Sequence, residues 1–146
     1  MAFPDQVIAQ GPEVFNFIPQ RPPMVMIDTL ISCADKRTCT SFKILPDNIF
    51  VKNGLFSEPG IIENIAQTAA AGLGFSISEK RKSNQIPIGV IGAIKDLKIY
   101  CLPETGEALN TEVKIVFEHM NASIIKGEVF AGTKMVADCE MKIFLL

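Results

Sequence analysis

The sequence predicts one α+β domain, residues 1–146, in which an antiparallel sheet curls around a single buried helix. Two short strand-like segments precede the helix and four longer ones follow it, so the βαβ alternation of a parallel sheet is absent. The predicted helix carries almost no charge, which is typical of a helix that is buried nearly all round. The length of 146 residues, without a linker or a repeat, fits one continuous core.

The first third of the chain is expected to begin irregularly and to continue as a hairpin. Residues 7–17 are weakly apolar, and Pro22 and Pro23 lack the N–H groups that a helix or a strand ladder requires. Residues 24–33 form the first predicted strand. Residues 37–44, which alternate Thr38, Thr40 and Phe42, form the second strand after a turn at 34–36.

Residues 58–78 predict the central helix. Pro59 suits the first turn, where its missing N–H has no partner to lose, and Glu58 lies near the positive end of the helix dipole. Apolar side chains recur near helical spacing, and the run of alanines has a high helix propensity. Because small side chains dominate, a sheet is able to approach this helix closely.

Four strand-like segments follow a polar loop at 80–85, and they cover residues 86–100, 108–117, 123–130 and 134–146. Turn-forming residues separate these four segments at 104–106, 119–121 and 132–133. Strands joined by such short turns are expected to be antiparallel.

The composition excludes several classes of function. A net charge of −2 and a pI near 5.4, without a basic cluster, predict no nucleic-acid partner. The longest apolar stretch, residues 60–75, is interrupted by Glu63 and is too short to insert across a membrane. The N-terminal residues lack the pattern of a signal peptide, so the chain is expected to be cytoplasmic. Four cysteines without a CxxC pair and a single histidine predict reduced thiols, no metal site and no cofactor.

Three stretches resemble the bacterial 3-hydroxyacyl-acyl-carrier-protein dehydratases. Residues 17–24 (FIPQRPPM), followed by Asp28, are similar to the I-P-H-R-x-P opening of that family. Residues 59–67 (PGIIENIAQ) are similar to the P-G…E-x-x-A-Q of its central helix, and residues 92–98 with 103–106 to the strand and turn after it. The resemblance implies the hotdog fold, a homodimer or a heterodimer with a related subunit, and an acyl thioester substrate carried on acyl carrier protein. The implied pathway is fatty-acid or specialised lipid biosynthesis.

The resemblance also implies which residues act. Elimination of water from a 3-hydroxyacyl thioester needs a base at the α-carbon, an acid at the β-hydroxyl and amide donors at the thioester oxygen. The family's acid, a carboxyl on the central helix, corresponds to Glu63, and the amide at the helix start to Gly60. Gln67, one turn further on, is expected to hold Glu63 by a hydrogen bond. Leu55 and Phe56 suit an acyl-chain tunnel, although core filling fits them equally well.

The family's catalytic base, a loop histidine, has no counterpart in this sequence. Leu55 occupies its position in a shortened loop, and Gln20 replaces the histidine of the opening motif. His119 falls in a predicted turn, where a histidine is usually solvated. This pattern resembles the dehydratase-like subunits of aryl polyene-type lipid pathways, some of which act with a second dehydratase subunit.

Three functions follow from these observations. The first is a lyase subunit, a hydro-lyase of the dehydratase type, that contributes Glu63 and borrows a histidine from its partner. The second is an acyl-thioester hydrolase, which needs a helix carboxylate but no histidine. The third is a non-catalytic subunit that binds acyl chains. The E-x-x-A-Q helix and the opening motif favour the dehydratase.

Overall fold

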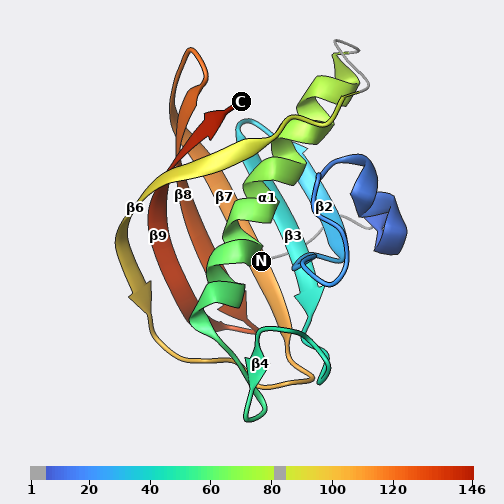
Figure 1. Ribbon diagram of the computed structural model, residues 1–146, viewed down its shortest axis with the longest axis vertical. Helices are drawn as coiled ribbons and strands as arrows, with labels where there is room; N and C mark the ends of the chain where they lie inside the picture. The colour runs from blue at the N-terminus through green and yellow to red at the C-terminus, as the bar shows by residue number, and fades with distance from the viewer. Residues whose placement is uncertain (1–5, 81–84) are drawn as a thin grey trace.

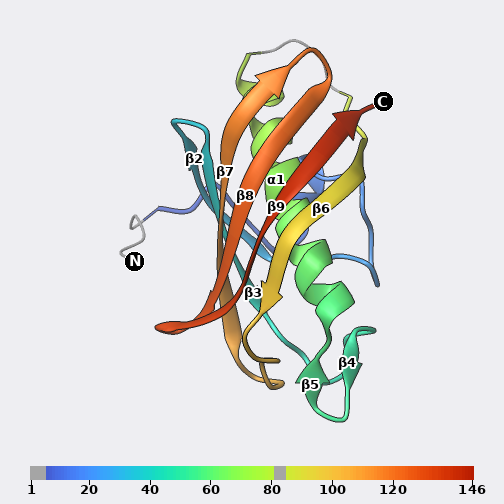
Figure 2. The ribbon, with the colours of Figure 1, turned by 90° about the vertical axis from the view of Figure 1, so that its left-hand side faces the viewer.

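The computed structural model describes residues 6–80 and 85–146, and one long helix lies in the concave face of a curled sheet (Figure 1). Within these residues the main sheet has seven strands in the order β1-β2-β3-β7-β8-β9-β6, and neighbouring strands are antiparallel. A separate two-stranded hairpin, β4–β5, lies at the end of the molecule where the helix begins (Figure 2). The predicted α+β class is confirmed, and this arrangement is the hotdog fold.

The elements follow the chain in the order β1 (Ala9–Gln10), η1 (Gly11–Asn16, a 3₁₀ helix), β2 (Thr29–Ala34), β3 (Arg37–Lys43), β4 (Val51–Lys52), β5 (Leu55–Phe56), α1 (Glu58–Glu79), β6 (Gly89–Ile99), β7 (Ala108–His119), β8 (Ala122–Ala131) and β9 (Lys134–Leu145). The predictions for β3, α1, β7, β8 and β9 agree with these bounds to within about two residues at each end.

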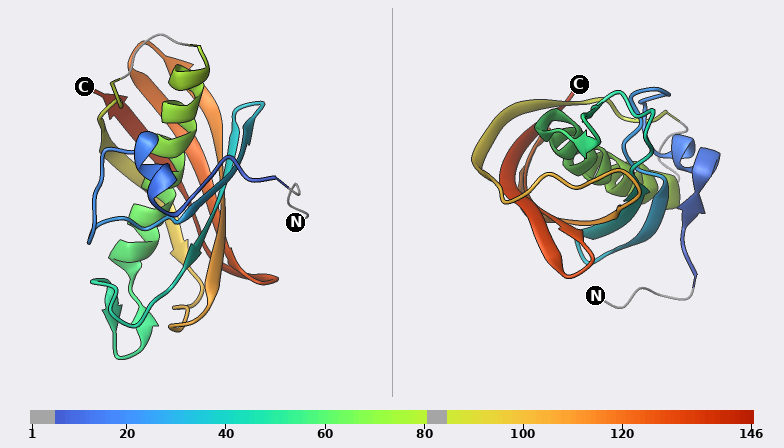
Figure 3. Two further views of the ribbon diagram at one scale, coloured as in Figure 1. Left: turned by 90° about the vertical axis from the view of Figure 1, so that its right-hand side faces the viewer. Right: turned by 90° about the horizontal axis from the view of Figure 1, so that it is seen from below.

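Helix α1 is enclosed along most of its length. Every residue in the range 60–77 is buried or half-buried, and the strands curve around the helix when it is viewed from below (Figure 3). In the main core Ile65 packs with Ile125 and Met141 of the sheet. Gly127 permits this approach, because a Cβ there would lie 2.5 Å from Cγ2 of Ile65. Among the described residues, no helix combines the length and the apolar character needed to cross a membrane.

The segment before β2 packs against the other half of α1 and forms a second core. Ile18, which follows η1, is fully buried and shares this cluster with Leu30 of β2 and Ala71 of α1. The rings of Phe17 and Phe75 meet edge to face, with their centroids 5.9 Å apart. This packing fixes the N-terminal segment beside the C-terminal half of the helix.

The predicted strand at 24–33 was wrong for its first five residues, since β2 begins at Thr29. The backbone of Met24 and Met26 is hydrogen-bonded by the side chain of Gln67 instead of a neighbouring strand. β1, η1 and the β4–β5 hairpin were not predicted, because elements of two to six residues carry too little periodicity. Of the polar loop predicted at 80–85, residues 81–84 lie outside the described residues, as do residues 1–5.

Strand β6 forms one edge of the main sheet, and within the described chain β9 is its neighbour. All residues from Gly89 to Lys98 are exposed. They include Ile91, Ile94 and Leu97, whose exposed fractions are 40%, 39% and 37%. A long edge strand with exposed apolar side chains is a surface that natural proteins usually cover.

Candidate active site

Glu63 lies in the second turn of α1 and is half-buried in the single chain. Its carboxylate Oε1 accepts a hydrogen bond of 3.0 Å from Nε2 of Gln67. The sequence predicted this bond, because residues four apart share one face of a helix. The bond limits the orientations that the carboxylate adopts.

Gln67 is fully buried and uses both ends of its amide. Nε2 also donates to the backbone carbonyl of Met24 at 2.8 Å, and Oε1 accepts from the backbone N–H of Met26 at 2.7 Å. The amide therefore joins Glu63 to the segment that follows the double proline. Because its side chain is enclosed, Gln67 would influence a substrate only through Glu63.

Asn64 is a second buried anchor, and it was not singled out from the sequence. Its Nδ2 donates to the carbonyl of Met26 at 2.8 Å, and its Oδ1 accepts from Oγ1 of Thr111 at 2.6 Å. The sequence feature that could have identified it is an uncharged polar residue within an apolar helix. Burial of an amide without hydrogen-bond partners is unfavourable, so such a residue is expected to have partners. Through Thr111, strand β7 is tied to the helical turn that carries Glu63.

Gly60 lies in the first turn of α1, where space is restricted. A Cβ at this position would lie 2.5 Å from Cζ of Phe56 and 2.8 Å from Cβ of Phe50. The Gly60 N–H donates to the carbonyl of Ser57 at 3.0 Å. A substrate oxygen would therefore share this donor, and the oxyanion role of Gly60 stays a prediction.

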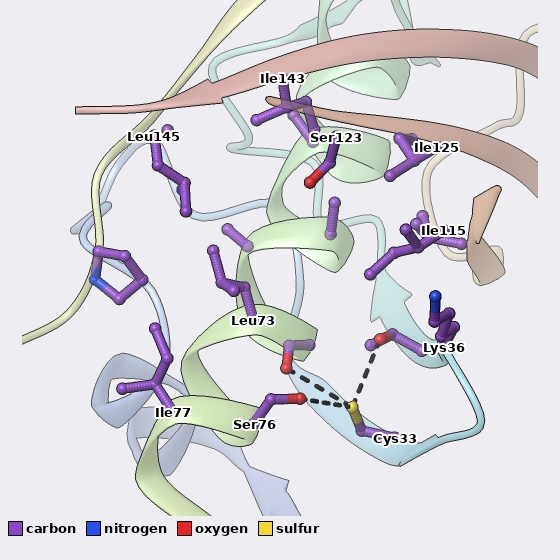
Figure 4. A pocket seen from close by; sticks show the side chains of 18 of the residues that line it. Cys33, Lys36, Leu73, Ser76, Ile77, Ile115, Ser123, Ile125, Ile143 and Leu145 are labelled. Atoms are coloured by element: carbon purple, nitrogen blue, oxygen red, sulfur yellow. Dashed lines mark hydrogen bonds between the residues drawn. The ribbon is translucent and has the colours of Figure 1, made fainter. Parts of the chain in front are cut away.

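Leu55 and Phe56 occupy different environments. Phe56 is fully buried in the main core, where its ring lies 5.8 Å from that of Phe42. Leu55 is half-buried on β5, paired with Lys52 and bridged to Glu104. A cavity of about 390 Å³ lies beside the C-terminal half of α1 (Figure 4), and neither residue, nor Gly60, Glu63 or Gln67, lines it. A tunnel role for Leu55 and Phe56 therefore stays a prediction.

The structure does not bring a histidine to Glu63. His119 is exposed at the end of β7, opposite Ala122 across the β7–β8 turn. This turn and the start of α1 lie at opposite ends of the molecule (Figure 1). Gln20, in the position of the other family histidine, is half-buried beside the C-terminal half of α1.

The four cysteines are free. Burial raises the pKa of the Cys139 thiol to about 11, and the neighbouring Asp138 carboxylate adds to this increase. Burial is also the main reason why the pKa of Cys39 is raised. Both thiols stay protonated at neutral pH and pack as small apolar groups. The described residues contain no cluster of three or more His, Cys, Asp or Glu side chains able to hold a metal ion.

Comparison with protein families identifies the group to which the chain belongs. Residues 12–145 match the family described as ApeP-like, ApeP dehydratase. The chain belongs to the ApeP-like dehydratase family. This assignment confirms the dehydratase-like function predicted from the motifs.

A curated relative of this ApeP-like chain is the 3-hydroxyacyl-[acyl-carrier-protein] dehydratase FabZ of Clostridium kluyveri. It is 28% identical over 139 residues, which cover 91% of this chain and 93% of the relative. The similarity therefore extends over nearly the full length of both proteins.

Solved structures share the fold of the ApeP-like chain. The dehydratase heterocomplex ApeI:P from Xenorhabdus doucetiae has a TM-score of 0.84 at 15% identity, covering 91% of this chain and 90% of that chain. A hypothetical thioesterase with coenzyme A from Streptococcus pneumoniae has a TM-score of 0.63 at 9% identity, covering 80% and 84%. At these identities the likeness concerns the hotdog fold, whose prediction is confirmed.

Proposed function

We propose that this chain is one subunit of a 3-hydroxyacyl-acyl-carrier-protein dehydratase, in which Glu63 is the proton donor and a related subunit supplies the base. Membership of the ApeP-like family and the similarity to FabZ support the reaction class. The single observation that carries the acid role is the Glu63 carboxylate, held by Gln67 near the start of a helix with almost no other charge.

The two proton transfers of the proposed reaction need only these two residues. A histidine of the partner removes a proton from the α-carbon, and the electron pair of that bond forms the α,β double bond. The β-carbon–oxygen bond breaks, and the hydroxyl leaves as water with the proton of Glu63. The products are an enoyl thioester and water, and proton exchange with solvent restores both side chains. Amide groups at the helix start would stabilise the charge that develops on the thioester oxygen.

We infer a partner because the part of the chain that the structure describes brings no histidine near Glu63. Leu55 cannot accept a proton, and His119 lies at the other end of the molecule. The unpaired edge of β6 is the proposed site of contact with the second subunit, since a strand paired there would cover Ile91, Ile94 and Leu97. The ApeI:P complex is a dehydratase heterocomplex, which supports a related subunit as the partner.

Thioester hydrolysis is the second candidate. A helix carboxylate such as Glu63 is able to activate a water molecule without a histidine, and the Streptococcus pneumoniae structure with this fold is a hypothetical thioesterase. The family match favours dehydration.

An assay of both reactions distinguishes the candidates. The purified chain is incubated with a 3-hydroxyacyl thioester on acyl carrier protein, alone and after co-expression with a histidine-bearing relative. We expect enoyl product from the complex, almost none from the chain alone, and none from a complex that carries Glu63→Gln. Dehydration by the chain alone would contradict the borrowed base, and His119→Ala would then be the first variant to examine. Release of free acid in place of enoyl product would favour the hydrolase.

A further inference from the structure

The outer face of the main sheet, which is turned away from α1, carries charged side chains in its middle. Ser123 and Ile125 of β8 point toward the helix and the cavity (Figure 4). Because side chains alternate along a strand, Ile124, Lys126 and Glu128 lie on the outer face. Lys126 and Glu128 are exposed, so nothing in the part of the chain that the structure describes covers them.

Three positive side chains form a band across this outer face. Lys114 of β7 is directly opposite Lys126 of β8, and on its other side it is directly opposite Arg37 of β3. We call these three residues the cationic band. The band ends at β9, where Glu140 is opposite Lys126.

Three carboxylates form a second band beside the first. Glu112 of β7 is directly opposite Glu128 of β8, and Glu128 is directly opposite Asp138 of β9. We call these residues the anionic band. On β7 and β8 the members of the two bands are two residues apart along the strand, so the bands run side by side at a separation of roughly 7 Å.

This arrangement of charge is unfavourable for a single chain, because like charges directly opposite each other on neighbouring strands are destabilising. Among the described residues one ion pair joins the bands, between Nη1 of Arg37 and Oε1 of Glu112 at 3.4 Å. Lys114, Lys126 and Glu128 form no ion pair within those residues. A local rule that is broken without compensation inside the fold indicates a functional surface.

Apolar side chains flank the two bands. Beyond the cationic band, Phe117 of β7 is opposite Ile124 of β8, and 55% of Phe117 is exposed. Beyond the anionic band, the half-buried Phe130 of β8 is opposite Asn110 of β7. The outer face of β8 therefore presents an apolar, a positive, a negative and a second apolar side chain in sequence. When the strand direction is reversed, each of these positions meets a complementary one.

We propose that two copies of the chain associate back to back through this face, about a two-fold axis that follows the boundary between the bands. Such an axis reverses the strands, so that Lys126 of one copy faces Glu128 of the other and Ile124 faces Phe130, each twice by symmetry. The two bands meet in the same way on β7. A two-fold axis parallel to the strands would place each band on its own counterpart, so charge complementarity selects the first orientation. This face is distinct from the β6 edge, and the inference does not depend on the proposed function.

Sedimentation equilibrium of the purified full-length chain tests the proposal. A contact made mainly by exposed charges is weak, so we expect the mass to double as the concentration rises from low micromolar toward millimolar. The doubling should recede when NaCl is raised from about 0.1 M to about 1 M, which shortens the Debye length from about 10 Å to about 3 Å.

Charge reversals identify the surface. Lys126→Glu and Glu128→Lys should each raise the dissociation constant of this step roughly tenfold or more, since each brings two pairs of like charges together. The variant that carries both substitutions has the net charge of the wild type and again faces opposite charges, so it should regain the association. Lys52→Glu, on the separate β4–β5 hairpin, makes the same change of charge away from this face and should associate like the wild type.

Lys114→Glu separates association from folding. This substitution places a carboxylate directly between Arg37 and Lys126, so Tm should not fall. The mass should nevertheless no longer double, because the new carboxylate faces Glu112 of the second copy. Loss of stability without loss of association would contradict the proposal.

Several other results would overturn it. One is a wild-type mass that does not double at any concentration, and another is a doubling that increases with salt. A doubling that survives both single reversals at β8 would place the contact elsewhere. Ile94→Asp on the β6 edge should leave the doubling in place, and its loss in that variant would assign the contact to β6. Because the readout is mass, absence of dehydration by the complex would refute the proposed function separately.

Discussion

Replacement of Gln67 by methionine tests the anchor that holds Glu63. Methionine has a similar length and no amide, so Gln67→Met removes three hydrogen bonds without emptying the site. Two of the partners are the backbone N–H of Met26, which is buried, and the carbonyl of Met24, which is partly buried. An unpaired buried group costs about 1–3 kcal/mol, so the expected loss in the free energy of unfolding is roughly 2–4 kcal/mol.

Urea denaturation followed by circular dichroism measures this loss. In heat denaturation the same change corresponds to a fall in Tm of roughly 5–15 °C for a chain of this size. Gln20→Met is the matched control, because the same substitution there removes an amide whose buried oxygen has no partner among the described residues. The control should be no less stable than the wild type, because it leaves no partner group unpaired and removes a buried acceptor that is itself unpaired.

The reasoning would be refuted if Gln67→Met unfolded within about 1 kcal/mol of the wild type, since its buried partners would then be satisfied in another way. Equal destabilisation by the two substitutions would also refute it, because the loss would follow from the change of residue type alone.

Three further predictions concern the acid, the thiols and the free edge. Glu63→Gln should abolish dehydration by the complex, and retained turnover would exclude the acid role. The same variant should change Tm by less than about 2 °C, because glutamine keeps an oxygen that accepts the hydrogen bond from Gln67. The free energy of unfolding should fall as the pH rises from 9.0 to about 11, because the folded state holds the Cys139 proton up to about 11 and the unfolded state releases it near 9.0. The contribution of this thiol to the free energy of unfolding is therefore fully present below pH 9.0. Urea denaturation at a series of pH values should show that the free energy of unfolding falls less steeply with pH in Cys139→Ala than in the wild type. Sedimentation should show a dimer for the wild type and dissociation for Ile94→Asp on β6; an unchanged dimer would place the interface elsewhere.

Part of the candidate site was predictable because it is local. Glu63 and Gln67 are four residues apart, so any helix over this stretch brings their side chains together. The other partners of Gln67 were not predictable, because Met24 and Met26 are 43 and 41 residues away along the chain. The same holds for Thr111, which is 47 residues from Asn64.

The sequence by itself determined the type and order of the long elements. The apolar spacing and alanine content of α1, and the short turns between β7, β8 and β9, are local features. They suffice because backbone geometry sets the side-chain period of a helix near 3.6 residues and that of a strand at 2. The order of these elements then excluded a parallel sheet.

Only the tertiary structure decided which of these side chains are enclosed. Phe56 lies in the core, Gln20 lies beside a cavity with an unpaired oxygen, and β6 is exposed along most of its length. The sequence around each of these positions is compatible with other outcomes. Burial is set by contacts between segments far apart in the chain, and those contacts exist only once the sheet has curled around α1.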